Sequence, residues 1–126
     1  MAVTLTTAAR NAACNAIVDL VDAGAGAGTL VLYLANATTE VATLTFSDPA
    51  FGDANTGVAT ASAITSDTSA TGNAAAATVA KFLDSDATEV LRCSVGIGSG
   101  DIQLSNNVIA AGETVAISAL TVTVPA

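Results

Sequence analysis

A run of glycine and alanine at residues 24–28 divides this chain into two parts whose apolar residues recur at different intervals. Before the run, apolar side chains recur every three or four positions, which predicts an amphipathic helix at about 7–23 with Thr6 or Thr7 as its N-cap. After the run the interval is two, which predicts β-strands. The helix is expected to bury Ala9, Ala13, Ile17, Leu20 and Val21, and to expose Asn11, Asn15, Asp19 and Asp22.

The second part consists of short alternating segments separated by turn residues. Segment 114–124 carries apolar side chains on both faces and is predicted to be a central strand, whereas segment 66–76 is rich in small polar residues and is predicted to be an exposed, mobile loop. The pattern favours a mainly β fold, an antiparallel β-sandwich or jelly-roll-like domain over residues 1–126, with the N-terminal helix covering a sheet or an open end. Strands are expected at 29–35, 40–46, 58–65, 77–83, 88–95, 102–104 and 114–124.

The composition restricts what such a domain can do. The 126 residues include no His, no Trp and three basic residues, and the net charge is −8. Nucleic acids and anionic membrane surfaces repel such a chain, so neither is expected as a partner. Large apolar side chains are few, so the core should be thin, and assembly into a homo-oligomer is expected to support it. The first residues lack the pattern of a signal peptide, which predicts synthesis in a cytoplasm.

The residues that could carry chemistry form no strong motif. The glycine run follows a helix instead of preceding one, so it does not predict a phosphate-binding loop. Asp84 and Asp86, with Glu89 nearby, fit a hairpin turn whose aspartates cap their own backbone, and a calcium site is the alternative. A nucleophile would need Lys81 or a carboxylate as its base, because the chain has no His. We predict no enzyme, with no catalytic, cofactor-binding or metal-binding residues.

The two cysteines, Cys14 and Cys93, lie far apart in the sequence. Two thiols without His cannot complete a zinc site, which needs four ligands. Cys14 falls in the predicted helix and Cys93 in a predicted strand, so buried free thiols are the favoured interpretation. A disulfide joining the helix to the sheet is the alternative.

The order of several segments resembles a group of small virion proteins of tailed bacteriophages. The resemblance spans nearly the whole chain and is carried by TTAARNAACNAIVDLVDAG, TLTFSDPAFG, GVATASAITSDTSA, FLDSDATEVLRCSVG and VIAAGETVAISALTVTVPA. It departs from the expected pattern at 77–81, where small residues stand in place of a bulky aromatic. The resemblance implies a virion location, most specifically a head decoration (cement) protein that binds the major capsid protein on the capsid surface as a homotrimer.

The position of two segments makes them candidates for assembly contacts. One is the N-terminal segment, expected to act as an arm, and the other is the start of the predicted 66–76 loop. A tail or fibre component that binds a host is the main alternative function, although adhesive loops are usually richer in aromatic residues. A small hydrolase is a remote third alternative for the function. The candidate contact residues are Ala2, Val3, Thr4, Leu5, Thr6, Ser66, Asp67, Thr68 and Ser69.

Overall fold

The computed structural model describes residues 3–126 and is mainly β with one N-terminal helix, as the sequence predicts. Helix α1 (Thr7–Asp19) continues into a single 3₁₀ turn, η1 (Leu20–Asp22). Its first turn is capped by Thr6, whose Oγ1 accepts a hydrogen bond from the backbone N–H of Ala9 at 3.2 Å. The hydroxyl satisfies one of the N–H groups that a helix start leaves without a partner, so the helix begins where the capping pattern predicts.

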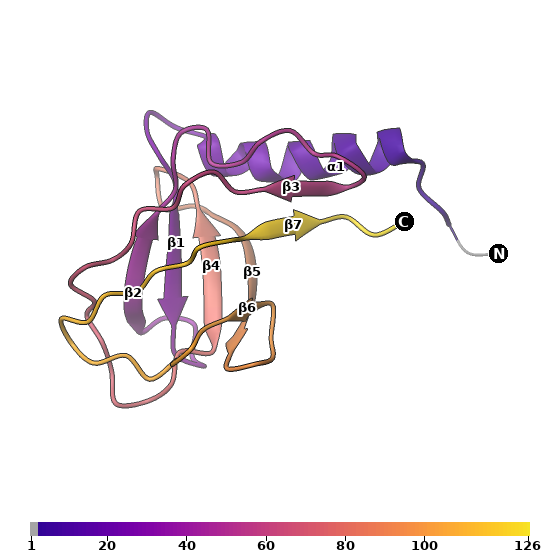
Figure 1. Ribbon diagram of the computed structural model, residues 1–126. Helices are drawn as coiled ribbons and strands as arrows, with labels where there is room; N and C mark the ends of the chain where they lie inside the picture. The colour runs from indigo at the N-terminus through magenta and orange to yellow at the C-terminus, as the bar shows by residue number, and fades with distance from the viewer. Residues whose placement is uncertain (1–2) are drawn as a thin grey trace.

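A curled five-stranded sheet forms the larger part of the molecule, which we call the body together with the loops that cross the sheet (Figure 1). The strand order is β2-β1-β4-β5-β6, antiparallel except for the parallel pair β5–β6. Leu30 lies opposite both Leu44 and Phe82, which places three large side chains in one row across the sheet. The strands are β1 (Thr29–Tyr33), β2 (Glu40–Thr45), β4 (Val79–Leu83), β5 (Glu89–Gly96) and β6 (Ile102–Gln103).

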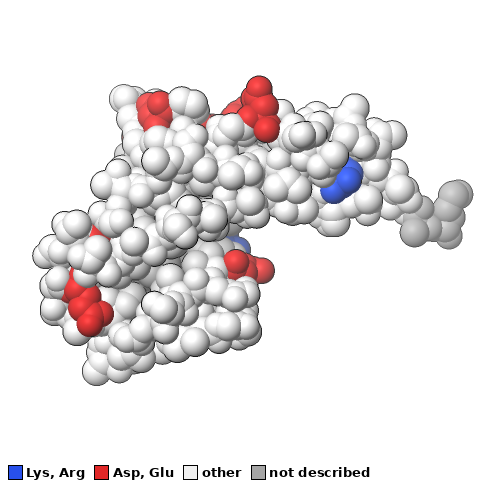
Figure 2. Space-filling view, viewed as in Figure 1, with Lys and Arg blue, Asp and Glu red and all other residues white. Residues whose placement is uncertain are grey.

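A second, smaller layer projects from the body and carries both chain ends (Figure 1). It consists of α1 packed on the antiparallel pair β3 (Val58–Thr60) and β7 (Thr121–Thr123), and we call these three elements the arm. Figure 2 shows the result as a bent outline, with a hollow where the arm meets the body. The sheet, the segments that cross its face and the arm together give a sandwich-like arrangement (Figure 1).

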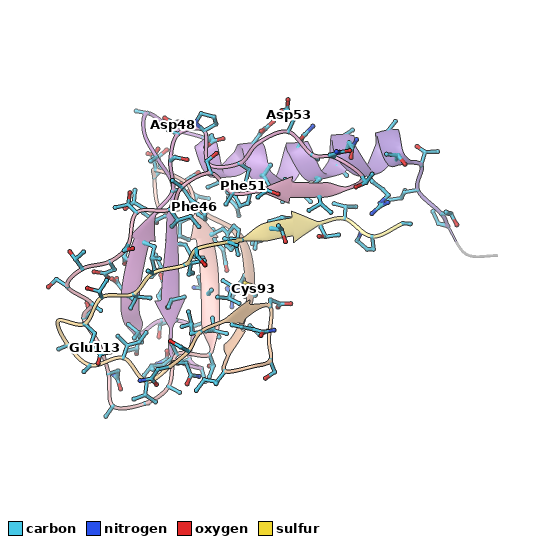
Figure 3. All side chains as sticks on the ribbon, viewed as in Figure 1. Phe46, Asp48, Phe51, Asp53, Cys93 and Glu113 are labelled. Atoms are coloured by element: carbon cyan, nitrogen blue, oxygen red, sulfur yellow. The ribbon has the colours of Figure 1, made fainter. Side chains whose placement is uncertain are left out.

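All three phenylalanines of the chain meet in the buried core, and Figure 3 labels two of them, Phe46 and Phe51. The ring centroids of Phe46 and Phe82 are 5.4 Å apart, and Phe51 lies 5.6 Å from Phe46 and 6.1 Å from Phe82. Such distances are typical of favourable aromatic packing. With so few bulky residues available, the sequence concentrates its largest ones at a single point, and small residues fill the remainder. The largest fully buried side chains are Phe46, Phe82, Leu30, Leu32, Leu44, Val21, Val41 and Cys14.

Several details of the sequence analysis are wrong, among them two that concern the arm. Segment 114–124 is not a central strand, because only Thr121–Thr123 is regular and it pairs with β3 in the arm. The buried face of the helix is formed by Cys14, Val18 and Val21, whereas Leu20 is 55% exposed. The helix is therefore rotated about its axis relative to the predicted orientation.

Candidate assembly surface

The polar side of the helix holds in place the loop that leads from β2 to β3. Asn15 accepts a hydrogen bond from the backbone N–H of Ala54 at 2.7 Å, and Asn11 accepts one from Gly57 at 2.7 Å. Asp22 accepts another from Ala50 at 2.8 Å. These side chains satisfy backbone donors of a loop that has few other partners, instead of facing water as predicted. The helix is consequently held against the loop that connects the sheet to β3.

The N-terminal segment, residues 3–6, extends beyond the start of α1 at the free end of the arm (Figure 1). All four residues are exposed, with Val3 at 87% and Leu5 at 37%. Ala2, also predicted as a contact, lies outside the described residues. Two exposed apolar side chains at positions i and i+2 would lie on one side of an extended chain, so this segment has the pattern of a strand that lacks a partner.

Residues 66–69, the second predicted contact segment, are part of the fold and run along the outer edge of β2. The carboxylate of Asp67 accepts hydrogen bonds from the backbone N–H groups of Thr43 at 2.8 Å and Ser69 at 3.0 Å. Its backbone exchanges two further hydrogen bonds with Val115, at 3.0 and 2.7 Å. Ser66 and Asp67 are half-buried, whereas Thr68 and Ser69 are exposed. The segment covers a sheet edge, and it does not lie near the N-terminal segment (Figure 1).

A groove in the angle between arm and body escaped the sequence analysis. It has a volume of about 270 Å³ and lies between β7 and the face of β4 and β5. Leu91 and Val122 supply apolar walls, and Cys93 (labelled in Figure 3) and Asp101 also line the groove. Burial, with a smaller contribution from the charge of Asp101, raises the pKa of the Cys93 thiol to about 11. Hydrogen bonds from the Ser94 backbone and hydroxyl lower the pKa of Asp101.

Each of the three basic side chains already contacts a group of the same molecule. Arg10 donates from Nε to the backbone carbonyl of Val124 at 2.8 Å, which joins the helix to the C-terminal end of β7. The Nζ of Lys81 lies 4.8 Å from the ring centre of Tyr33 on the outer face of the sheet. Arg92 forms a two-pronged pair with Glu89, whose hydrogen bonds from the guanidinium lower the pKa of that carboxyl.

The Asp84–Asp86 region has the geometry of a capped turn. One carboxylate oxygen of Asp84 accepts hydrogen bonds from the backbone N–H groups of Asp86 and Thr88, both at 2.9 Å. Across residues 3–126 there is no group of three or more His, Cys, Asp or Glu side chains placed to hold a metal ion. Cys14 is a buried free thiol and Cys93 a half-buried one, so the alternative of a disulfide is wrong.

Comparisons with known proteins identify no relative of this chain. No protein-family model, curated protein or solved structure matches the chain. Within the described part of the chain, the helix is too short and too polar to cross a membrane.

Proposed function

We propose that this chain is a structural protein of a tailed-bacteriophage virion, and specifically a decoration protein that binds the outside of the head. In this role it contacts the major capsid protein and stabilises the shell by bridging neighbouring capsid subunits. The resemblance of its segments to small phage virion proteins supports the proposal, as does a composition suited to packing and persistence.

The observation that carries the proposal is the projecting arm. A protein that clamps adjacent subunits must contact surfaces that are separated in space, which a bent molecule with an arm and a body can do. The hydrogen bonds of Asn11, Asn15 and Asp22 fix α1 and η1 to the loop at 50–57, which joins the sheet to β3. Such fixed geometry lowers the entropy lost on binding, because the two contact regions are already held apart.

The surface charge suits the outside of a capsid. The net charge of −8 is carried by separate acids, and the face in Figure 2 is mostly uncharged. Asp48 and Asp53 lie on the loop next to the helix, on the side away from the groove (Figure 3). A surface of this kind has no affinity for packaged DNA but presents broad neutral areas for contact with protein.

The proposal is tested with expanded, undecorated heads of the phage whose genome encodes the chain. Purified protein added in excess is expected to co-sediment with these heads and to raise their temperature of disruption. Unexpanded heads are the control for a surface that forms only on expansion. Quantitative mass spectrometry of complete virions should find hundreds of copies. Failure to bind expanded heads contradicts the proposal, and a handful of copies with binding to tails supports the alternative of a tail component.

A further inference from the structure

Strand β7 has one edge without a partner in the part of the chain that the structure describes. It pairs only with β3, in an antiparallel register that places Val122 opposite Ala59. The N–H of Val124 donates to the carbonyl of Gly57, and the N–H of Ala61 donates to the carbonyl of Leu120. Since inward and outward backbone groups alternate along an antiparallel pair, those of Thr121 and Thr123 point away from β3. They form a short, open sheet edge.

The groove described above lies directly beside this open edge. Thr121, Val122 and Thr123 form one wall, and Leu91 and Cys93 form the wall opposite. A strand added to β7 would therefore direct every second side chain into the groove. The groove is small and its walls combine apolar side chains with the polar groups of Thr121, Thr123 and Asp101, which suits an apolar side chain of the size of valine or leucine.

The chain's own N-terminal segment has the matching pattern. Val3 and Leu5 alternate with Thr4 and Thr6, none of these residues is charged, and Val3 is the most exposed large apolar residue described. Thr6 already has extended backbone angles, φ −68° and ψ 161°. We propose that residues 3–6 of one copy add as a strand to β7 of a second copy and insert Val3 and Leu5 into its groove.

The direction of the chain favours pairing between two copies over pairing within one molecule. Helix α1 starts at the free end of the arm and β7 runs towards that end, where Arg10 binds the carbonyl of Val124 (Figure 1). Residues 3–6 could therefore lie beside their own β7 only if the chain reversed its direction at Thr6, which caps the helix. In the structure they instead extend beyond the start of α1 (Figure 1). Residues 3–6 of a second copy can approach the open edge without this reversal, and they bring no charge to a groove that Asp101 helps to line.

A cysteine crosslink provides the first test, because Cys93 is part of the groove. Val3→Cys and Leu5→Cys are each oxidised with copper–phenanthroline in purified protein. At least one is expected to form a disulfide-linked oligomer that peptide mass spectrometry assigns to the new cysteine and Cys93. Thr4→Cys is the matched control, because its side chain points away from the groove in an added strand. No link to Cys93 from either position, or an equal link from Thr4→Cys, overturns the proposal.

The second test measures assembly without any crosslink. Light scattering is expected to show an oligomer of the unaltered protein at high concentration. The double variant Val3→Asp/Leu5→Asp should no longer form this oligomer, whereas Thr4→Asp should still form it. All these positions are exposed, so circular dichroism should show the same fold in each variant. A monomer at every concentration, or an oligomer that survives the double variant, contradicts strand exchange. Both tests use protein alone, so their outcome is independent of binding to heads.

Discussion

The carboxylate of Asp67 accepts a hydrogen bond of 2.8 Å from the backbone N–H of Thr43, on the outer edge of β2. Edge strands expose unpaired backbone groups that invite further pairing. Here the segment at 65–72 covers that edge, because Thr45 and Thr65 also exchange two hydrogen bonds and the N–H of Gly72 donates to Val41. One sheet edge is thus closed by a side chain and a loop, whereas the second edge of β7 has no partner among residues 3–126.

Replacing Asp67 with alanine should destabilise the protein by about 1–3 kcal/mol, because it leaves the Thr43 N–H without its acceptor. Thr68→Ala is the matched control, since Thr68 is exposed and adjacent, and its change should stay within about 0.5 kcal/mol. Urea unfolding followed by circular dichroism measures both. Equal stability of the two variants would show that the carboxylate does not hold the sheet edge.

The hydrogen bonds between the helix and the loop at 50–57 predict a similar contrast. Asn15→Ala removes the acceptor for the Ala54 N–H and should cost about 1–3 kcal/mol. Asp19 lies one turn later on the same helix, is exposed, and stands near the negative end of the helix dipole. Asp19→Ala should therefore be neutral or slightly stabilising. If thermal unfolding shows the two variants to be equivalent, the polar side of the helix faces water.

The phenylalanine cluster should be the point where the core tolerates least change. Phe46→Ala removes a ring that contacts both other phenylalanines, and it should cost about 3–5 kcal/mol or prevent folding. Ile97→Ala removes a large apolar side chain that is 59% exposed, and it should change stability by about 0.5 kcal/mol or less. The midpoints of urea unfolding should separate the two variants clearly. If Phe46→Ala destabilised the protein no more than Ile97→Ala does, Phe46 would lie outside the core.

The helix shows what the sequence can and cannot predict. Its ends followed from the capping residue and the glycine run, which act locally. Its orientation did not, because Asn11 and Asn15 have the same polarity whether they face water or the backbone amides of a loop. Only the fold reveals that residues 54 and 57 bring unsatisfied N–H groups to that side.

The prediction of a central strand at 114–124 failed for a different reason. The alternation of this segment is regular, but its two ends pair with different parts of the molecule, and only Thr121–Thr123 forms a strand. Val115 pairs with Asp67, whereas Leu120 lies next to β3, and neither long-range partner is visible in the local pattern. The groove escaped prediction likewise, because it joins Cys93 to residues near 122.

The thiol of Cys93 should react slowly with alkylating reagents in the folded protein. Its pKa of about 11 leaves roughly a hundredfold less thiolate near pH 8 than an ordinary cysteine has. Mass spectrometry of peptides after iodoacetamide treatment should show a rate for Cys93 that rises with pH up to about 11, and a much faster rate in urea. Alkylation of Cys93 at equal rates with and without urea would mean that the groove does not bury the thiol.

The same raised pKa makes stability depend on pH in a predictable direction. The folded state holds the Cys93 proton more tightly than the unfolded state, so this contribution is complete below the ordinary pKa of about 9 and is lost as the pH rises to about 11. Tyr33, whose pKa burial also raises, acts in the same direction but is present in both the parent protein and Cys93→Ser. The difference in unfolding free energy between these two proteins isolates Cys93. The unfolding free energy of the parent protein should fall relative to that of Cys93→Ser as the pH rises from about 9 to about 11. A difference that stays constant over this range would contradict burial as the cause of the raised pKa of Cys93.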